Sequence, residues 1–265
     1  MPRDISRKET DTLSKKVWII SSRRMKIYII SAMAIFIMAG GFLVNRSVFP
    51  VFSTEESPAA FYRADIEEKK VALTFNISWG EDRALPILDT LKENDITATF
   101  FISGAWAERH PEITERIVED GHTIGNHGYR YEHYPRLDDD EIVRDLNLSH
   151  KKIKDVTELD VKYFRPPHGD FNKTVLEKIE QFGYSTVHWS VGGNDWNNPG
   201  VEQIVANITE DVEPGDVILL HASDSAKQTG DALPSILTEL KNQNYSFVNI
   251  EELISQANTE VEEIN

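Results

Sequence analysis

The chain has 265 residues, of which 40% are hydrophobic, and a formal net charge of −16 at pH 7. This length suits one large domain with an appendage, and the negative charge argues against a nucleic-acid partner because phosphates would repel it. The sequence contains no cysteine, which excludes disulfides and thiolate sites, so a metal would have to be held by His, Asp or Glu.

The N-terminal segment predicts a membrane anchor. Residues 1–26 form a basic leader with eight Lys or Arg against three Asp or Glu, and residues 27–44 carry no charge. A helix of that length rises roughly 27 Å, close to the ~30 Å hydrocarbon thickness of a bilayer. The leader would stay in the cytoplasm, so we expect a single-pass protein of the cell membrane with an extracytoplasmic C-terminal domain. A cleavable secretory signal is the alternative, and it exports the same residues.

Three further regions are predicted after the anchor. Residues 45–65 read as a stalk, residues 66–258 as a folded domain and residues 259–265 as an acidic tail. From residue 45 onward the chain carries 20 Lys or Arg and 41 Asp or Glu, so the exported part is strongly acidic.

Within the domain, short apolar runs alternate with longer amphipathic segments. Strands are expected at 71–76, 97–102, 122–126, 162–165, 185–189, 217–221 and 246–249. Helices are expected at 83–94, 112–120, 139–157, 173–182, 201–211 and 234–243. This order, repeated about seven times, predicts an α/β fold with a parallel sheet and outer helices, either open or closed into a barrel. In a barrel, functional residues collect at the carboxyl ends of the strands.

Several element boundaries have local causes. Asn172 can cap the helix at 173–182, and Gly183 can end it. The dipeptide at 214–215, Pro-Gly, predicts a turn before the strand at 217–221. The apolar run of that strand is typical of one covered on both faces.

Polar residues follow the ends of several predicted strands. His221 ends the run 217–221, where its ring could protonate a leaving group near neutral pH, although a core histidine fits equally well. Arg165 precedes two prolines that form a rigid turn, so it could hold a catalytic carboxylate or make a surface ion pair of little energy. Asp195 could bind Arg165 or orient a histidine, and Trp196 could line a sugar pocket or cover the core.

One polar segment, "IGNHGYRYEHYP", lacks a histidine pair at helical spacing. His127 and His133 are six residues apart, and Tyr131 stands at the i+4 position that would place a second imidazole beside His127 on a helix. His133 could therefore join a metal site only through an irregular loop.

Taken in order, five short motifs resemble those of the polysaccharide deacetylase family. This family has the NodB homology domain and is of the carbohydrate esterase family 4 type. The motifs are "TFNISWG", "GNH", "RPPHG", "NDW" and "LLH", and the resemblance covers residues 69–256. Within the family, the sequence looks most like the membrane-anchored, sporulation-associated deacetylases of Bacillus-type bacteria. The resemblance implies a distorted (β/α)7 barrel that hydrolyses a non-peptide C–N bond, the acetamido group of peptidoglycan or chitin-like sugars, with a divalent metal that is usually zinc.

The resemblance also assigns roles to single positions. The family's base aspartate falls on Asn76, and its metal ligands fall on Ile77, His127 and Tyr131. The other catalytic positions fall on Arg165, Asp195 and His221, the last as general acid, and the substrate contacts fall on Trp79, Pro167, Trp196 and Leu220.

These replacements predict weak turnover. An asparagine has no basic oxygen to take a proton from water, and an isoleucine cannot coordinate a metal. One imidazole is too few, because catalytic zinc normally keeps three protein ligands. Two functions therefore stay open: an N-deacetylase with a shifted or feeble site, and a catalytically silent glycan-binding or scaffolding domain of the cell envelope. The second would keep a sugar-lined groove of Trp79, Trp189, Trp196, Arg165 and His221.

A relocated metal site would rescue the enzyme. Glu81 and Asp82 follow the first strand by a short turn, and with His127 and His133 they could form a new set of ligands if their loops bend inward. The alternative is that the two acids are ordinary helix-start carboxylates, which the helix dipole favours there.

Overall fold

The structure is a computed structural model that describes residues 53–54 and 57–263. All of these belong to one compact unit, Phe49–Asn265. The predicted leader at 1–26 and the predicted anchor at 27–44 lie outside the described residues. Among the helices that are described, none is both long and apolar enough to span a membrane.

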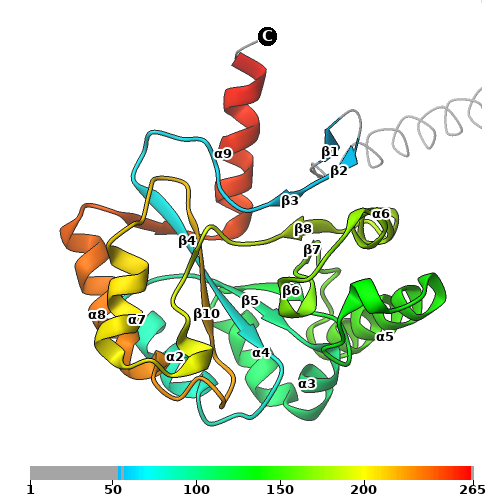
Figure 1. Ribbon diagram of the computed structural model, residues 1–265. Coiled ribbons are helices and arrows are strands. Elements are labelled where there is room, and N and C mark those ends of the chain that lie inside the picture. The colour runs from blue at the N-terminus through cyan, green and yellow to red at the C-terminus, as the bar shows by residue number, and fades with distance from the viewer. Residues whose placement is uncertain (1–52, 55–56, 264–265) are drawn as a thin grey trace, which may run out of the picture. The chain divides into compact units, whose positions relative to one another are not determined.

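Strands and helices alternate along most of the described chain (Figure 1). The strands are β1 (Ser53–Thr54), β2 (Ser57–Pro58), β3 (Ala60–Phe61), β4 (Lys70–Ile77), β5 (Thr99–Ile102), β6 (Thr123–Asn126), β7 (Tyr163–Phe164), β8 (Ser185–Val187), β9 (Val191–Gly192), β10 (Val217–His221) and β11 (Ser246–Val248). The helices are α2 (Ala84–Glu93), α3 (Gly104–Arg109), α4 (Pro111–Glu119), α5 (Asp139–Thr157), α6 (Lys173–Gln181), α7 (Val201–Thr209), α8 (Thr229–Asn242) and α9 (Ile250–Glu263). Single 3-10 turns form η1 (Tyr134–Arg136), η2 (Pro167–Gly169) and η3 (Asp195–Asn197).

The main sheet is parallel and curls toward closure. Its strand order is β3-β8-β7-β6-β5-β4-β10-β9, and β11 pairs with the first half of β4. β8 and β9 belong to opposite parts of this order, yet only residues 188–190 separate them in the chain. The segment 185–192 therefore connects β7 to β10, and the sheet fits a distorted (β/α) barrel. The sevenfold repeat that the resemblance implies stays a prediction.

The side chains of β4 alternate between the two faces of the barrel wall. Its odd-numbered residues, Val71, Leu73, Phe75 and Ile77, pack with the helices in the larger apolar cluster. Among its even-numbered residues, Ala72 belongs to a smaller cluster inside the barrel, while Thr74 and Asn76 bond to a buried arginine. Both faces of β4 are thus buried, as expected for a parallel strand covered on both sides. Each buried Leu or Ile contributes roughly 1.5–3 kcal/mol of stability.

α9 and β3 cover the end of the barrel where the strands begin. Ile250, Leu253 and Ile254 of α9 pack with Phe61 of β3 and with Ala72 in the inner cluster. In Figure 1, α9 lies on the side opposite to the arrowhead of β4. The end where the strands finish is left for a site.

The predicted element boundaries largely match the structure, and the three expected local signals are present. The Asn172 side chain accepts a hydrogen bond from the backbone of Val175 at the start of α6, and Gly183 follows that helix with a φ of +90°. Gly215 makes the turn before β10 with a φ of +84°. A side chain at 215 would collide with Ala64, because a Cβ there would lie 1.9 Å from its carbonyl oxygen.

Three features differ from the prediction. α3 and α9 were not expected, because the first spans six residues and the second has a short apolar face among acidic residues. α8 begins at Thr229 rather than at 234. The end of the predicted stalk at 45–65 packs on the domain: β3 pairs with β8, and Arg63 forms an ion pair with Asp216 at 2.6 Å.

Candidate functional site

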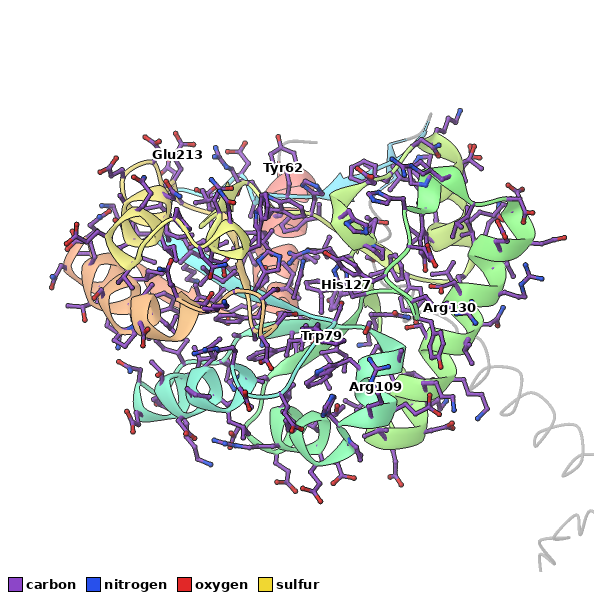
Figure 2. All side chains as sticks on the ribbon, turned by 60° about the horizontal axis from the view of Figure 1, so that its bottom comes forward. Tyr62, Trp79, Arg109, His127, Arg130 and Glu213 are labelled. Atoms are coloured by element: carbon purple, nitrogen blue, oxygen red, sulfur yellow. The ribbon has the colours of Figure 1, made fainter. Side chains whose placement is uncertain are left out.

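A cleft of about 1080 Å³ opens where the parallel strands end. It is lined by the last inward residues of β4 and β10, by α3, and by the loops that follow the strands from β4 to β10. The lining residues are Asn76, Ser78, Trp79, Ser103, Ala105, Arg109, Tyr129, Arg130, Tyr131, Glu132, His168, Gly169, Trp189, Trp196, Leu219, His221, Ser223 and Ser225. Figure 2 turns this end of the barrel toward the viewer and labels Trp79, Arg109 and Arg130 there.

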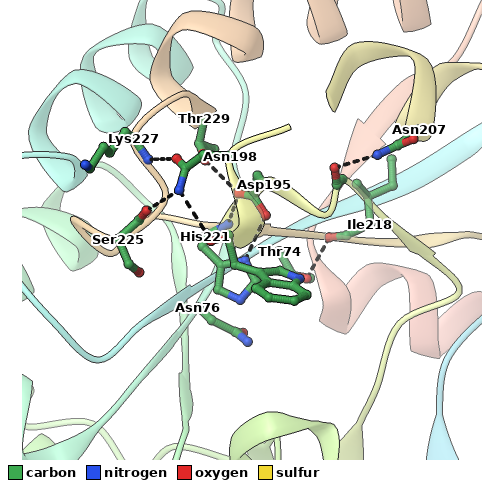
Figure 3. A network of polar contacts seen from close by, with 12 residues as sticks. Thr74, Asn76, Asp195, Asn198, Asn207, Ile218, His221, Ser225, Lys227 and Thr229 are labelled. Carbon is green, nitrogen blue, oxygen red and sulfur yellow. Dashed lines mark hydrogen bonds and ion pairs between the residues drawn. The ribbon is translucent and has the colours of Figure 1, made fainter. Parts of the chain in front are cut away.

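On one side of the cleft, Asp195 orients His221 (Figure 3). The Nδ1–H of His221 donates to Asp195 Oδ1 at 2.9 Å. Asp195 Oδ2 accepts from the backbone N–H of His221 at 2.7 Å and from the Thr229 hydroxyl at 2.6 Å. Because Nδ1 is occupied, the ring presents Nε2 to the cleft. Of the two roles predicted for Asp195, the structure shows the orientation of a histidine.

The loop that carries Trp196 is tied down beside this pair. Asn194 and Asn198 flank η3 in the left-handed region, with φ of 53° and 51°, which asparagine tolerates better than most residues. Asn198 Nδ2 donates to the carbonyl of Ser225 at 2.9 Å, and its Oδ1 accepts from the backbone N–H of Lys227 at 2.7 Å. Trp196 remains 59% exposed at the rim.

A buried arginine lies inside the barrel, against β4 and the end of β8. Arg165 is fully buried and donates to Thr74 Oγ1 at 2.9 Å and to Asn76 Oδ1 at 3.0 Å. It also donates to the carbonyl of the last residue of β8 and to the carbonyl of the residue after it. Its guanidinium also lies 4.1 Å from the ring centre of Phe101. Burial lowers the pKa of Arg165 well below its ordinary value, although an arginine still keeps its proton at neutral pH. No described carboxylate pairs with it, so the prediction that Arg165 holds a carboxylate is wrong.

Asn76, the position that the resemblance assigns to the base, lies at the end of β4 beside Arg165. Its Oδ1 accepts the hydrogen bond from Arg165, and the residue lines the cleft. An amide oxygen in this arrangement cannot take a proton from water. That Asn76 replaces a catalytic base stays a prediction.

The other predicted metal positions do not form a donor set. Ile77 faces the helices and is fully buried, because side chains alternate along β4. His127 is buried with its Nδ1 at 2.6 Å from the carbonyl oxygen of Arg165, and burial lowers the pKa of His127 to about 3. Burial raises the pKa of Tyr131 above its ordinary value, so the phenol stays neutral. One imidazole beside an amide and a phenol does not fit a catalytic zinc ion.

The relocated metal site is also wrong. Glu81 lies 3.0 Å from Nδ1 of His110, and His133 lies 2.5 Å from Asp170. Asp82 is exposed in the turn before α2. Across residues 53–54 and 57–263, no group of three His, Asp or Glu side chains is placed to hold a metal ion.

The loop after β4 presents Trp79 to the cleft. Gly80 has a φ of +74°, and a Cβ there would lie 2.0 Å from Asp224 Cγ, so only glycine fits. Asp224 in turn accepts from the backbone N–H groups of Glu81 and Arg83 at 3.2 and 3.0 Å. These bonds hold the loop while Trp79 stays 68% exposed.

Two predicted substrate contacts lie elsewhere. Leu220 is fully buried among the helices, and its neighbour Leu219 lines the cleft instead, because successive side chains on β10 point to opposite faces. Pro167 is buried, and the next two residues of η2 face the cleft in its place.

Further lining residues were not predicted. Tyr129 and Arg130 directly follow the "GNH" motif, so their position in the sequence was a usable signal. Arg109 is the last residue of α3, a helix that was not expected, and the sequence offered no signal for its position.

The chain is similar to known polysaccharide deacetylases. A family model described as polysaccharide deacetylase matches residues 63–187. The peptidoglycan-N-acetylglucosamine deacetylase of Bacillus cereus is 36% identical over 71% of this chain and 89% of its own. The peptidoglycan-N-acetylmuramic acid deacetylase PdaA of Bacillus subtilis is 32% identical over 74% of this chain and 75% of its own.

A solved structure adds a similar protein of a different kind. A CE4 family pseudoenzyme from Bacillus anthracis superposes with a TM-score of 0.70 and 34% identity, covering 74% of this chain and 69% of its own. A mutant of that pseudoenzyme with restored enzymatic activity superposes with the same TM-score.

Proposed function

Because the chain belongs to the polysaccharide deacetylase family, we propose that it binds acetamido sugars of cell-wall glycan in this cleft with little or no hydrolysis. The names of the similar deacetylases point to peptidoglycan as the glycan. The similar pseudoenzyme from Bacillus anthracis is a precedent for a silent member.

One observation carries the proposal: the guanidinium of Arg165 meets the amide of Asn76, not a carboxylate. Hydrolysis of an acetamido group needs a water molecule that loses its proton as it attacks. On this side of the cleft, Asn76 is an amide, Ile77 points away and His127 is buried against a carbonyl. In this family a divalent metal would normally activate that water, and the donor set does not fit one.

The cleft retains what binding needs. Its volume of about 1080 Å³ can take several sugar rings. Trp79 and Trp196 are exposed at its rim, and Trp189 lines it. Indole faces stack on sugar rings, whose C–H faces are apolar.

Binding and turnover can be measured on the full chain with N-acetylglucosamine oligomers. We expect acetate release near background, with or without added zinc, and measurable binding that Trp196→Ala weakens about tenfold. The matched control is Tyr62→Ala, because Tyr62 is also an exposed aromatic residue but lies away from the cleft. Rapid acetate release that His221→Ala abolishes would overturn the proposal.

Slow N-deacetylation is a second candidate function. It is favoured by the complete Asp195–His221 pair, which could still protonate a leaving amine. It predicts a weak acetate signal that disappears in His221→Ala and persists in Asn147→Asp on the remote helix α5. If no such signal is seen, glycan binding is the only one of the two functions that remains.

We also propose that residues 27–44 anchor the protein in the cell membrane with the cleft outside the cytoplasm. The charge-free run and its basic flank support this. Protease added to intact cells should then digest the domain, while residues 1–26 stay protected. Recovery of the whole chain in the soluble cytoplasmic fraction would contradict it.

A further inference from the structure

The side-chain amide of Asn76 has only one chemically allowed orientation. Its Oδ1 lies 3.0 Å from a terminal nitrogen of Arg165. A guanidinium can only donate hydrogen bonds, so the amide oxygen has to face it, and the amide nitrogen has to face away.

The amide nitrogen is directed to the cleft. Asn76 is the last inward residue of β4, and its side chain lines the cleft at 6% exposure. No described residue accepts a hydrogen bond from Asn76 Nδ2. The cleft therefore presents a nearly buried N–H donor that only a ligand or water can satisfy.

An acceptor lies next to this donor. His221 on β10 is the register partner of Asn76, and both line the cleft (Figure 3). Because Nδ1 of His221 donates to Asp195, Nε2 is a hydrogen-bond acceptor whenever it carries no proton. A donor and an acceptor side by side match the C=O and N–H of a secondary amide.

We infer that Asn76 recognises the acetyl group: its Nδ2–H donates to the carbonyl oxygen of an N-acetyl sugar, and the cleft selects glycans that still carry this group. A carboxylate at position 76 has no proton to donate, so the replacement that removes the base creates the donor. The charge of Arg165 on the amide oxygen polarises the N–H and strengthens it. This inference rests on the proposed function and names the part of the ligand that is read.

The selectivity can be measured with two neutral oligomers of the same linkage. N-acetylglucosamine tetramer carries acetamido groups, and the β-1,4 glucose tetramer has hydroxyls in their place. Calorimetric titration of the full chain should show tighter binding of the acetylated tetramer. The hydrogen bond from Asn76 accounts for about fivefold of that ratio.

Asn76→Asp removes the donor at constant size and supplies Arg165 with a counter-charge, so we expect it to fold. The affinity ratio between the two tetramers should fall about fivefold. Asn76→Ala should lower it similarly and serves if the first variant misfolds. Asn147→Asp, an exposed residue of α5, makes the same chemical change outside the cleft and should leave the ratio unchanged.

The outcomes separate the two proposals. If the acetylated tetramer binds and both Asn76 variants keep the wild-type ratio, the inference is overturned while glycan binding stands. If neither tetramer binds the wild-type chain, the proposed function fails and the inference fails with it.

Discussion

Two neighbouring parts of the cleft wall differ in what their polar side chains do for the fold. On the β10 and η3 side, Asp195 accepts three hydrogen bonds, and these bonds join a strand, a loop and a helix. On the β4 and β6 side, Asn76 accepts one bond from Arg165, and Ile77 contributes only apolar packing. The first side is thus a structural network whose geometry also suits proton donation. The second, formed by Asn76, Ile77 and Arg165, supports the barrel without an acidic side chain of its own.

Adjacent residues on β4 show the same difference at closer range. Asn76 faces the cleft and a buried cation, while Ile77 faces the helices and a dry apolar cluster. An acidic side chain would therefore have opposite effects at the two positions. The free energy of unfolding, measured by urea titration, can test this comparison.

The largest expected effect is at Ile77. Ile77→Asp should lower the free energy of unfolding by about 4 kcal/mol, because it places a carboxylate among apolar side chains without a partner. Ile77→Val, which removes one methyl group, should cost about 1 kcal/mol. A loss below 1 kcal/mol for the aspartate would show that the side chain at 77 reaches the cleft.

Loss of the Asp195 network should have the next largest effect on the free energy of unfolding. Asp195→Asn keeps the shape of the side chain but turns an N–H₂ group toward one of its three hydrogen-bond donors. We therefore expect the free energy of unfolding to fall by about 3 kcal/mol. The control is Asp170→Asn, because Asp170 pairs with His133 at the surface and should cost less than about 0.5 kcal/mol. Equal effects of the two variants would argue that the Asp195 network does not stabilise the fold.

Asn76→Asp should change stability in the opposite direction. A carboxylate beside Arg165 compensates a buried cation that has no described counter-charge, and we expect a gain of about 2 kcal/mol at pH 7. Asn147→Asp, with the same change of charge on α5, should stay within about 0.5 kcal/mol of the wild type. If Asn76→Asp is destabilising, the proposed lack of a counter-charge near Arg165 is wrong.

The smallest expected effect is on stability at low pH, and it involves His122, a buried histidine away from the cleft. His122, just before β6, accepts a hydrogen bond at Nδ1 from the backbone of Ala98, and burial lowers its pKa to about 4. The unfolded chain takes up this proton near pH 6.5, so the stability present above pH 6.5 is lost as the pH falls toward 4.

His122→Asn should reduce that loss by about 1 kcal/mol per pH unit between pH 6 and 4.5. Comparison of the urea midpoints of both proteins across this range measures it. Parallel pH curves of the two proteins would mean that His122 does not contribute to acid unfolding.

Local patterns in the sequence predicted much of the fold. The bounds of α5 and β10 were predicted to the residue, because a long amphipathic period and a short apolar run after a Pro-Gly turn are strong signals. α3 and α9 were missed because six residues, or a short apolar face among acids, give too weak a period. For the site, the motifs located Asn76, Trp196 and His221 at the cleft. Leu220 was misplaced although the two-residue alternation of a strand could have identified Leu219.

By itself, the sequence determined that no acid stands at the positions to which the resemblance assigns a base and a metal ligand, because residue type alone sets what a side chain can ionise or coordinate. Only the tertiary structure decided what those positions do instead. Arg165 reaches Asn76 across 89 positions of the chain, and Asp195 reaches His221 across 26. Which of several polar residues become partners depends on how the strands are ordered around the barrel, and no local pattern carries that information.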